Sequence, residues 1–322
     1  MTESDTKIEV ASKDRQETSR LMGNTKIGTH SLNAARPMLH IRQATIASLV
    51  VACLLLIGTS CRAQNTATGF FGGWENRVRK TMAEQPGWPI PVAMPSSGLV
   101  QAFRVDFARL ITPSGTKTWN YGLSRGFYLV PWYRTEVDVL VPAYIQHNSA
   151  VKDGFGDFSM LLKYRLASGN ESHGAYSLSV ALGTTLPTAS YKNGSPYCTV
   201  SPTLLGGKGF GRFDVQSSLG AVLPTANGAR VGRVVLWNTV GQIHLGKWFW
   251  PEVEDNASFY HGGPNDGRVQ NFVTPGLLLG KFKLRTERSS RLAVFFGGGV
   301  QIATSHFHTY NHALVFTGRM LF

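Results

Sequence analysis

Charged and polar residues recur at every second position in several segments of the chain. Arg104 and Asp106 are two residues apart, and Arg134, Glu136 and Asp138 repeat that spacing. In a β-strand, residues at this spacing share one face of the sheet. Side chains of opposite charge on neighbouring strands can then pair, with about 5 Å between their Cβ atoms. The spacing therefore predicts a polar face within a sheet.

This polar face supplies the candidates for residues that line the inside of a barrel. They are Arg104, Asp106, Arg134, Glu136, Asp138, Asp157, Lys163, Arg165, Asp214, Gln216, Asn238, Gln242, Glu252, Glu254, Asn256 and Arg319. One interpretation is a lattice of paired charges that fills a narrow barrel, and we favour it because buried charges are normally paired. The other is that these residues line a solute path and set its selectivity.

A second group of reactive side chains lies near the carboxyl end of the chain, in TSHFHTYNH. It contains Ser305, His306, His308 and His312. A serine beside a histidine can supply a nucleophile and its base, and neighbouring histidines can bind a transition metal. No acidic or amide residue that would orient the base stands in an obvious partner strand. We interpret the group as polar residues of an external loop, and we expect no enzymatic activity, no metal and no cofactor.

The elements that position the polar residues are predicted to be long strands. In GFGDFSMLLKYRL, Met160, Leu162 and Tyr164 share one face, whereas Lys163 and Arg165 share the other. We count twelve such segments, each long enough for a tilted strand that crosses a membrane in about 9–11 residues. They lie near residues 98–110, 117–127, 132–145, 155–167, 173–186, 197–210, 213–224, 234–246, 249–261, 269–282, 290–303 and 311–322.

The connections between these segments alternate between longer polar loops and tight turns. Tight turns are predicted at Pro131-Trp132, Gly211-Arg212 and Lys247-Trp248. Aromatic residues crowd the tight-turn side, as expected at a lipid–water boundary. They are Trp132, Tyr133, Phe210, Trp248, Phe249 and Trp250. Long external loops, short periplasmic turns and an even strand number are typical of an all-β, outer-membrane, up-and-down antiparallel barrel.

Composition and charge agree with this fold class. Only 16% of the 322 residues are charged, whereas about a quarter are charged in a typical soluble protein. The net charge of +13 comes from basic residues spread along the chain. A nucleic-acid-binding protein more often has a basic stripe or a recognisable module. We therefore expect no nucleic-acid partner.

The amino-terminal region resembles a secretory signal. The apolar run of residues 45–58 follows His40 and Arg42 and ends in small residues before Gln64. It is too short to cross a membrane comfortably, so we predict a signal peptide cleaved after Ala63. Lipidation of Cys61 stays open, as does the choice between Met1 and Met38 as the start.

We expect three parts in the chain. Residues 1–63 form an amino-terminal extension and signal peptide, residues 64–97 a periplasmic or plug-like segment, and residues 98–322 the barrel. Three adjacent glycines in LAVFFGGGVQIA, residues 292–303, indicate either a bend of the barrel, which we favour, or a contact with a plug.

Several motifs resemble the outer-membrane transporter family associated with the meta-pathway of phenol degradation. They are GFGDFSMLLKYRL (154–166), TLLGGKGFGRFDVQSSLGAVLPT (203–225), LWNTVGQIHLGKWFWPEVEDN (236–256), VTPGLLLGKF (273–282) and NHALVFTGRMLF (311–322). The resemblance implies a barrel in the outer membrane and uptake of hydrophobic or aromatic compounds, with no residue-level site. The last strand, ending at Phe322, resembles the outer-membrane assembly signal. We therefore expect outer-membrane lipids and the barrel-assembly machinery as partners.

Three functions are compatible with this sequence. The first is a passive channel or uptake transporter for small hydrophobic or aromatic solutes. The second is a surface-structural or adhesion barrel with a sealed lumen. The third, an outer-membrane lipid hydrolase, depends on the histidine group and is the least favoured.

Overall fold

The computed structural model describes residues 73–123, 125–285 and 291–322. The expected signal peptide, Met38, Cys61 and the cleavage site after Ala63 lie outside these residues. Among the described residues, no helix is long and apolar enough to span a membrane.

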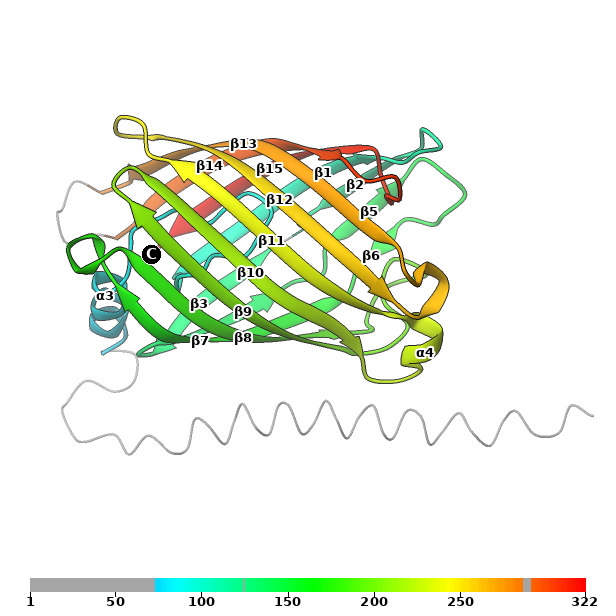
Figure 1. Ribbon diagram of the computed structural model, residues 1–322, viewed down its shortest axis with the longest axis horizontal. Coiled ribbons are helices and arrows are strands. Elements are labelled where there is room, and N and C mark those ends of the chain that lie inside the picture. Colours follow the sequence, from blue (N-terminus) through cyan, green and yellow to red (C-terminus); the bar gives the residue numbers. More distant parts are fainter. Residues whose placement is uncertain (1–72, 124, 286–290) are drawn as a thin grey trace, which may run out of the picture. The chain divides into compact units, whose positions relative to one another are not determined.

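The described strands form one antiparallel sheet that closes on itself through pairing of the last strand with the first (Figure 1). The strands are β1 (Ala102–Ile111), β2 (Lys117–Tyr121), β3 (Gly126–Trp132), β4 (Thr135–Leu140), β5 (Tyr144–His147), β6 (Gly154–Phe155), β7 (Phe158–Gly169), β8 (Tyr176–Leu186), β9 (Thr199–Phe210), β10 (Phe213–Pro224), β11 (Arg233–Ile243), β12 (Phe249–His261), β13 (Val269–Lys283), β14 (Ala293–Ala303) and β15 (His312–Leu321). The helical elements are α3 (Trp74–Ala83), α4 (Gly228–Val231) and two short 3₁₀ turns, η1 (Glu171–His173) and η2 (Gly263–Asn265).

Three of the barrel strands are interrupted, which explains why the strand labels outnumber the strands of the barrel. β1 pairs with both β2 and β3, so these two segments occupy one position in the ring. β4 with β5, and β6 with β7, are continuous in the same way. The result is a closed, up-and-down, 12-stranded antiparallel barrel, which confirms the fold predicted from the sequence.

The two faces of the barrel differ in the way that the alternation predicts. Leu219, Trp237 and Phe316 point outward and are 54%, 55% and 59% exposed. Asp106 and Glu254 point inward and are fully buried. An outer face of large apolar side chains is unfavourable in water but favourable against lipid tails. The outer face is therefore that of a membrane-spanning barrel.

Two of the predicted boundary aromatics lie at the tight-turn end but contact other parts of the protein. Trp250 shares a face with Glu252, so it points inward, where it stacks on His244 with 4.0 Å between ring centroids. Tyr133 donates a hydrogen bond to Glu84, just beyond helix α3. Phe210, Trp248 and Phe249 are exposed at the tight-turn end. Trp250 and Tyr133 do not face lipid, because Trp250 packs inside the lumen and Tyr133 binds the residue that follows α3.

The tight turn predicted at Pro131-Trp132 is wrong by two residues. β3 continues through Pro131 to Trp132, and the turn is formed by Tyr133 and Arg134, whose φ is 63°. The strand tolerates Pro131 because the ladder between β3 and β4 is irregular from Leu129 to Trp132. A proline, which lacks an N–H, is accepted at such an irregularity.

The three glycines of β14 allow close approach of the neighbouring strands. A Cβ on Gly297 would lie 2.7 Å from the carbonyl oxygen of Leu277, on β13. A Cβ on Gly298 would lie 2.6 Å from the carbonyl oxygen of Val315, on β15. These clashes are with the backbone of adjacent strands, so the glycines serve packing within the barrel wall.

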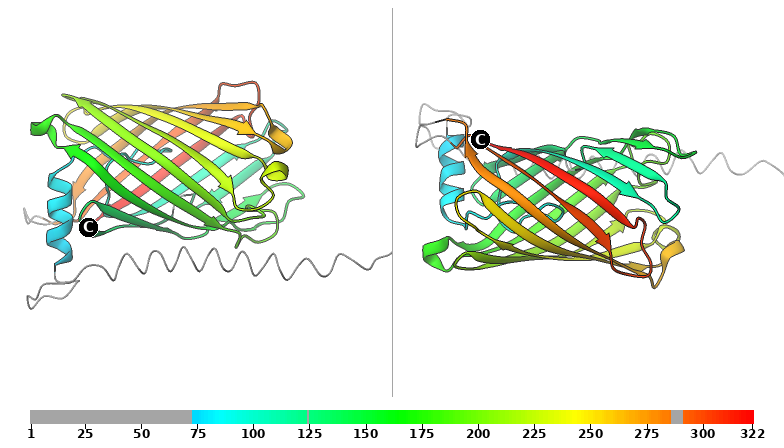
Figure 2. Two further views of the ribbon diagram at one scale, coloured as in Figure 1. Left: turned by 60° about the horizontal axis from the view of Figure 1, so that its bottom comes forward. Right: turned by 90° about the horizontal axis from the view of Figure 1, so that it is seen from above.

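Helix α3 lies at the end of the barrel where the chain also finishes (Figure 2). Its Val78 packs with Leu99 and Val130 in a small apolar cluster. Arg77 donates a hydrogen bond from Nε to the carbonyl oxygen of Pro131 at 3.2 Å. Lys80 stands over the ring of Tyr133, 5.1 Å from its centroid. The helix is therefore docked on the β3–β4 turn.

Candidate solute path and the segment that occupies it

Residues 84–101, which join α3 to β1, run inside the barrel, and we call them the plug segment (Figure 1). Their hydrogen-bond partners are inward-facing side chains of β1, β4, β7, β8, β10, β12 and β15. These strands stand on all sides of the ring. One short segment can reach all of them only from within the lumen.

Buried carboxylates accept hydrogen bonds from the backbone N–H groups of the plug segment. Glu252 Oε1 accepts from Val92 at 2.8 Å. Glu254 accepts from Ala93 at 2.7 Å and from Met94 at 2.8 Å, one with each carboxylate oxygen. Glu136 accepts from the N–H of Val100 in the same way.

Buried cations donate to the carbonyl groups of the same segment. Arg104 donates from Nη2 to Val92 at 2.6 Å, and Arg319 donates from Nη2 to Pro91 at 2.7 Å. Lys163 donates from Nζ to the carbonyl oxygen of Gly98 at 3.2 Å. Buried backbone groups need partners, and a segment rich in proline cannot supply them from a helix or strand of its own. The wall residues supply them instead.

Neutral side chains complete this set of contacts around Ser97. Gln216 Oε1 accepts from the N–H of Ser97 at 3.0 Å and from its hydroxyl at 2.9 Å. Ser177 and Ser179 donate to the carbonyl oxygen of Ser97 at 3.0 and 2.8 Å. All the polar groups of Ser97 are therefore bound by the wall.

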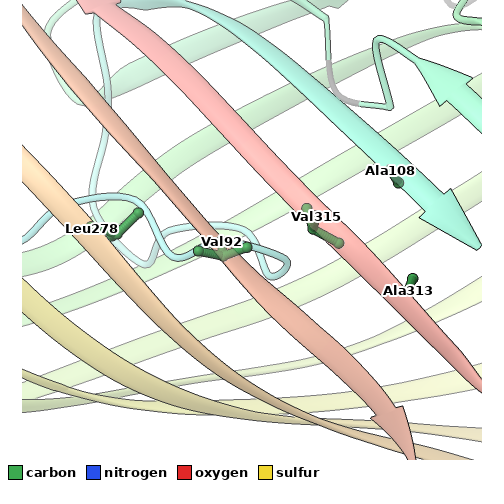
Figure 3. Packing of buried hydrophobic residues seen from close by; sticks show 5 residues of the cluster. All are labelled: Val92, Ala108, Leu278, Ala313 and Val315. Carbon is green, nitrogen blue, oxygen red and sulfur yellow. The ribbon is translucent and has the colours of Figure 1, made fainter.

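An apolar contact also fixes the middle of the plug segment to the barrel wall. Val92 packs with Ala108, Leu278, Ala313 and Val315, which lie on β1, β13 and β15 (Figure 3). All five side chains are almost fully buried. The plug segment is therefore held by both hydrogen bonds and packing.

Most of the candidates predicted for the lumen are buried inside the barrel. These are Arg104, Asp106, Glu136, Asp138, Lys163, Arg165, Asp214, Gln216, Gln242, Glu252, Glu254 and Arg319. Asn238 and Asn256 are half-buried and share a hydrogen bond of 3.3 Å across neighbouring strands. Several of these residues bind the plug segment in the structure. Neither the charge lattice nor the solute path proposed from the sequence included this role.

Two candidates lie outside the lumen. Arg134 belongs to the tight turn between β3 and β4, with its guanidinium 5.3 Å from the centroid of the Tyr133 ring. Asp157, between β6 and β7, accepts hydrogen bonds from Ala189 at 3.0 Å and Ser195 at 2.6 Å, in the loop after β8. Alternation cannot place these two residues because neither is in a strand.

Two pairs of buried charges agree with the lattice interpretation. Arg104 and Asp106 approach to 2.7 Å, and Lys163 and Glu136 to 2.6 Å. The cation of each pair also donates to the plug segment. Such a pair is costly to break on one side, since the other charge is left buried and alone.

Two cavities flank the plug segment. The central cavity, of about 180 Å³, is bounded by the plug segment and by β1, β3, β4, β7, β8 and β9. The helix-side cavity, of about 190 Å³, is bounded by the plug segment, Met82 of α3, and residues near the ends of β13, β14 and β15. Ile90 and Val100 line both cavities. These two apolar side chains therefore form the partition between them.

Several residues that bind the plug segment or line the cavities could not be identified from sequence patterns. Ser177 and Ser179 have strand spacing, but serine is common on either face of a sheet. Ile90 and Val100 lie in an irregular segment, in which no periodicity assigns a direction to a side chain. The run of prolines in WPIPVAMP was the one available signal of an extended chain without secondary structure.

The serine and histidines near the carboxyl end form ordinary loop contacts. The Ser305 hydroxyl accepts from the N–H of Asn271 at 2.8 Å and donates to the carbonyl oxygen of Phe307 at 2.7 Å. His308 bonds to the carbonyl oxygen of Ser305 and to Asn311. Within residues 73–123, 125–285 and 291–322, no group of three histidine, cysteine, aspartate or glutamate side chains could hold a metal ion.

Fold and lumen together define the class of protein, which is a transmembrane β-barrel of the outer-membrane type with a plug segment inside it. A family model described as "Putative MetA-pathway of phenol degradation" matches residues 93–254, and the chain belongs to this family. The resemblance seen in the sequence is thereby confirmed. Among solved structures, the crystal structure of an outer-membrane channel from Pseudomonas putida F1 is similar, with 16% sequence identity and a TM-score of 0.49, over 71% of this chain and 97% of that chain. A comparison with curated proteins gave no match.

Proposed function

We propose that this protein is an outer-membrane channel through which small hydrophobic or aromatic solutes pass without energy coupling. The observation that carries the proposal is the pair of cavities on either side of the partition formed by Ile90 and Val100. A solute that passed from one cavity to the other would move from the central lumen to the helix side. The narrowest part of this path is formed by two apolar side chains, so an apolar solute loses no hydrogen bonds when it passes them.

The hydrogen bonds of the plug segment support the proposal that the solute is apolar. Many of its N–H and carbonyl groups between Ile90 and Val100 are already bound by wall side chains. A passing solute therefore meets few free donors or acceptors there. A strongly polar solute would lose its water without replacement, which is unfavourable.

We further propose the orientation and the location of the barrel. Outer-membrane barrels carry short turns on the periplasmic side and longer loops outside. The tight turns, α3 and Phe322 lie at one end of this barrel, so this end is assigned to the periplasm. Export is assigned to the cleaved signal peptide expected before Gln64.

A liposome swelling assay tests the channel proposal. Proteoliposomes that contain the full mature chain should swell in small apolar or aromatic solutes and stay unchanged in sugars of much larger size. A barrel that passes none of these solutes would instead support the second candidate, a sealed structural barrel. The many contacts of the plug segment are the observation that favours this second candidate.

A further inference from the structure

One carboxylate in the central cavity carries an oxygen atom without a partner. Asp138, on β4, lines this cavity and is 4% exposed. Its Oδ1 atom has no hydrogen-bond partner among the described residues. Buried polar atoms are almost always bonded, so an exception of this kind indicates a missing ligand or water.

The neighbouring charges do not satisfy Asp138. Arg104 is paired with Asp106 at 2.7 Å and also donates to Val92. Lys163 is paired with Glu136 at 2.6 Å and also donates to Gly98. Both cations of the cavity wall thus have other partners, and Oδ1 of Asp138, a residue that lines the cavity, is left without one.

The rest of the cavity wall is largely apolar. Leu140, Leu161, Ala181 and Leu205 line it from the barrel, and Met94 lines it from the plug segment. Its volume is about 180 Å³. In another protein, an apolar cavity of about 150 Å³ holds benzene. The space therefore suits one six-membered ring, with an acceptor at one position on its wall.

We propose that the central cavity binds a small apolar molecule, up to the size of one six-membered ring, that carries a hydrogen-bond donor directed at Asp138. Ala93 and Pro95, which also line the cavity, are exposed, so a solute can reach it. The proposal rests on the proposed channel function only in placing this site on the solute path.

Fluorine NMR titration of the full mature chain in detergent tests the site with two probes, fluorophenol and fluorobenzene. Fluorophenol should bind up to about tenfold more tightly, because its hydroxyl can donate a buried hydrogen bond to Asp138 that fluorobenzene cannot make. Asp138→Leu keeps an apolar side chain there but removes the acceptor, so the preference for fluorophenol should vanish.

A matched control is available in Asp214. This buried carboxylate also has an unpartnered oxygen, Oδ2, but it does not line the central cavity. Asp214→Leu should therefore retain the preference for fluorophenol. If Asp138→Leu fails to fold, Ala181→Leu provides a second test, since it fills the cavity and should weaken the binding of both probes.

Equal affinity of the unmodified protein for the two probes would overturn the site, and so would a preference that persists in Asp138→Leu. Solute flux is a separate readout. Binding without flux would contradict the channel and keep the site, whereas flux without the binding preference would contradict the site and keep the channel.

Discussion

Buried acidic and basic side chains inside a barrel can form a lattice of paired charges. In this barrel, several of them also bind the backbone of the plug segment. Glu252 and Glu254 accept from three consecutive N–H groups, while Arg104 and Arg319 bind the carbonyl groups on the same stretch. Each contact is a hydrogen bond within a region largely shielded from water, where such bonds are strong.

Glu254→Gln should therefore loosen the plug segment. One amide oxygen cannot replace two carboxylate oxygens, so at least one N–H loses its partner at a cost of about 1.5–3 kcal/mol. Urea unfolding followed by heat-modifiable gel migration measures this loss. Glu171→Gln is the control, because Glu171 also accepts from a plug-segment N–H, that of Gly87 at 2.8 Å, but does so in an exposed position. Equal losses for the two variants would contradict the assignment.

Thiol labelling separates the two faces of the plug segment. In a Cys198→Ser background, Ala93→Cys should react quickly with a water-soluble thiol reagent, whereas Met94→Cys should not, since Ala93 is exposed and Met94 is buried. The native Cys198 should itself react slowly, because burial raises the pKa of its thiol and so lowers the fraction of reactive thiolate at neutral pH. Comparable rates at positions 93 and 94 would be inconsistent with the plug segment described above.

Among the elements, the strands could be predicted one by one, whereas residues 64–97 could be predicted only as a periplasmic or plug-like segment, without its path or its contacts. A period of two residues places Lys163 and Arg165 on one face and Tyr164 on the other without any knowledge of tertiary structure. Between Glu84 and Gln101 there is no period, and the conformation is imposed by side chains far away in the sequence, such as Arg319. β1 accordingly begins at Ala102, later than the segment predicted from residue 98.

One buried cation binds the carboxyl end of α3. Arg165 donates to the carbonyl oxygen of Thr81 at 2.6 Å and to Gln85 at 3.0 Å, and its charge pairs with Glu84 at 3.2 Å. Arg165→Ala should loosen the carboxyl end of the helix, which hydrogen exchange would detect as faster exchange in residues 74–83 with little change in β10–β12.

The matched variant for this test is Arg79→Ala. Arg79 is exposed and pairs with Glu75 within the helix, an interaction of about 0.3–0.5 kcal/mol at most. Exchange in α3 should hardly change in this variant. Equal acceleration of exchange in both variants would mean that the hydrogen bonds within the helix, and not the contacts of Arg165, determine its protection from exchange.

At the scale of the whole molecule, the apolar outer face implies a dependence on depth in the membrane. Leu219 lies within β10 on the outer face, whereas Phe213 begins the same strand next to the tight turn. An arginine near the bilayer midplane costs about 2–4 kcal/mol, and one near the interface about 0–1 kcal/mol. Leu219→Arg should therefore lower the unfolding free energy in lipid vesicles much more than Phe213→Arg. The opposite order would argue against this placement in the membrane.

We propose that solutes pass beside the plug segment, through the partition of Ile90 and Val100. The most direct measurement is the rate of solute uptake by liposomes that contain Ile90→Ala, compared with Val92→Ala. Both variants shorten an apolar side chain of the same segment, but Val92 packs against the wall and lines neither cavity. Uptake of small aromatic solutes should be faster for Ile90→Ala and little changed for Val92→Ala. Unchanged uptake in Ile90→Ala, with the barrel folded, would rule out this path.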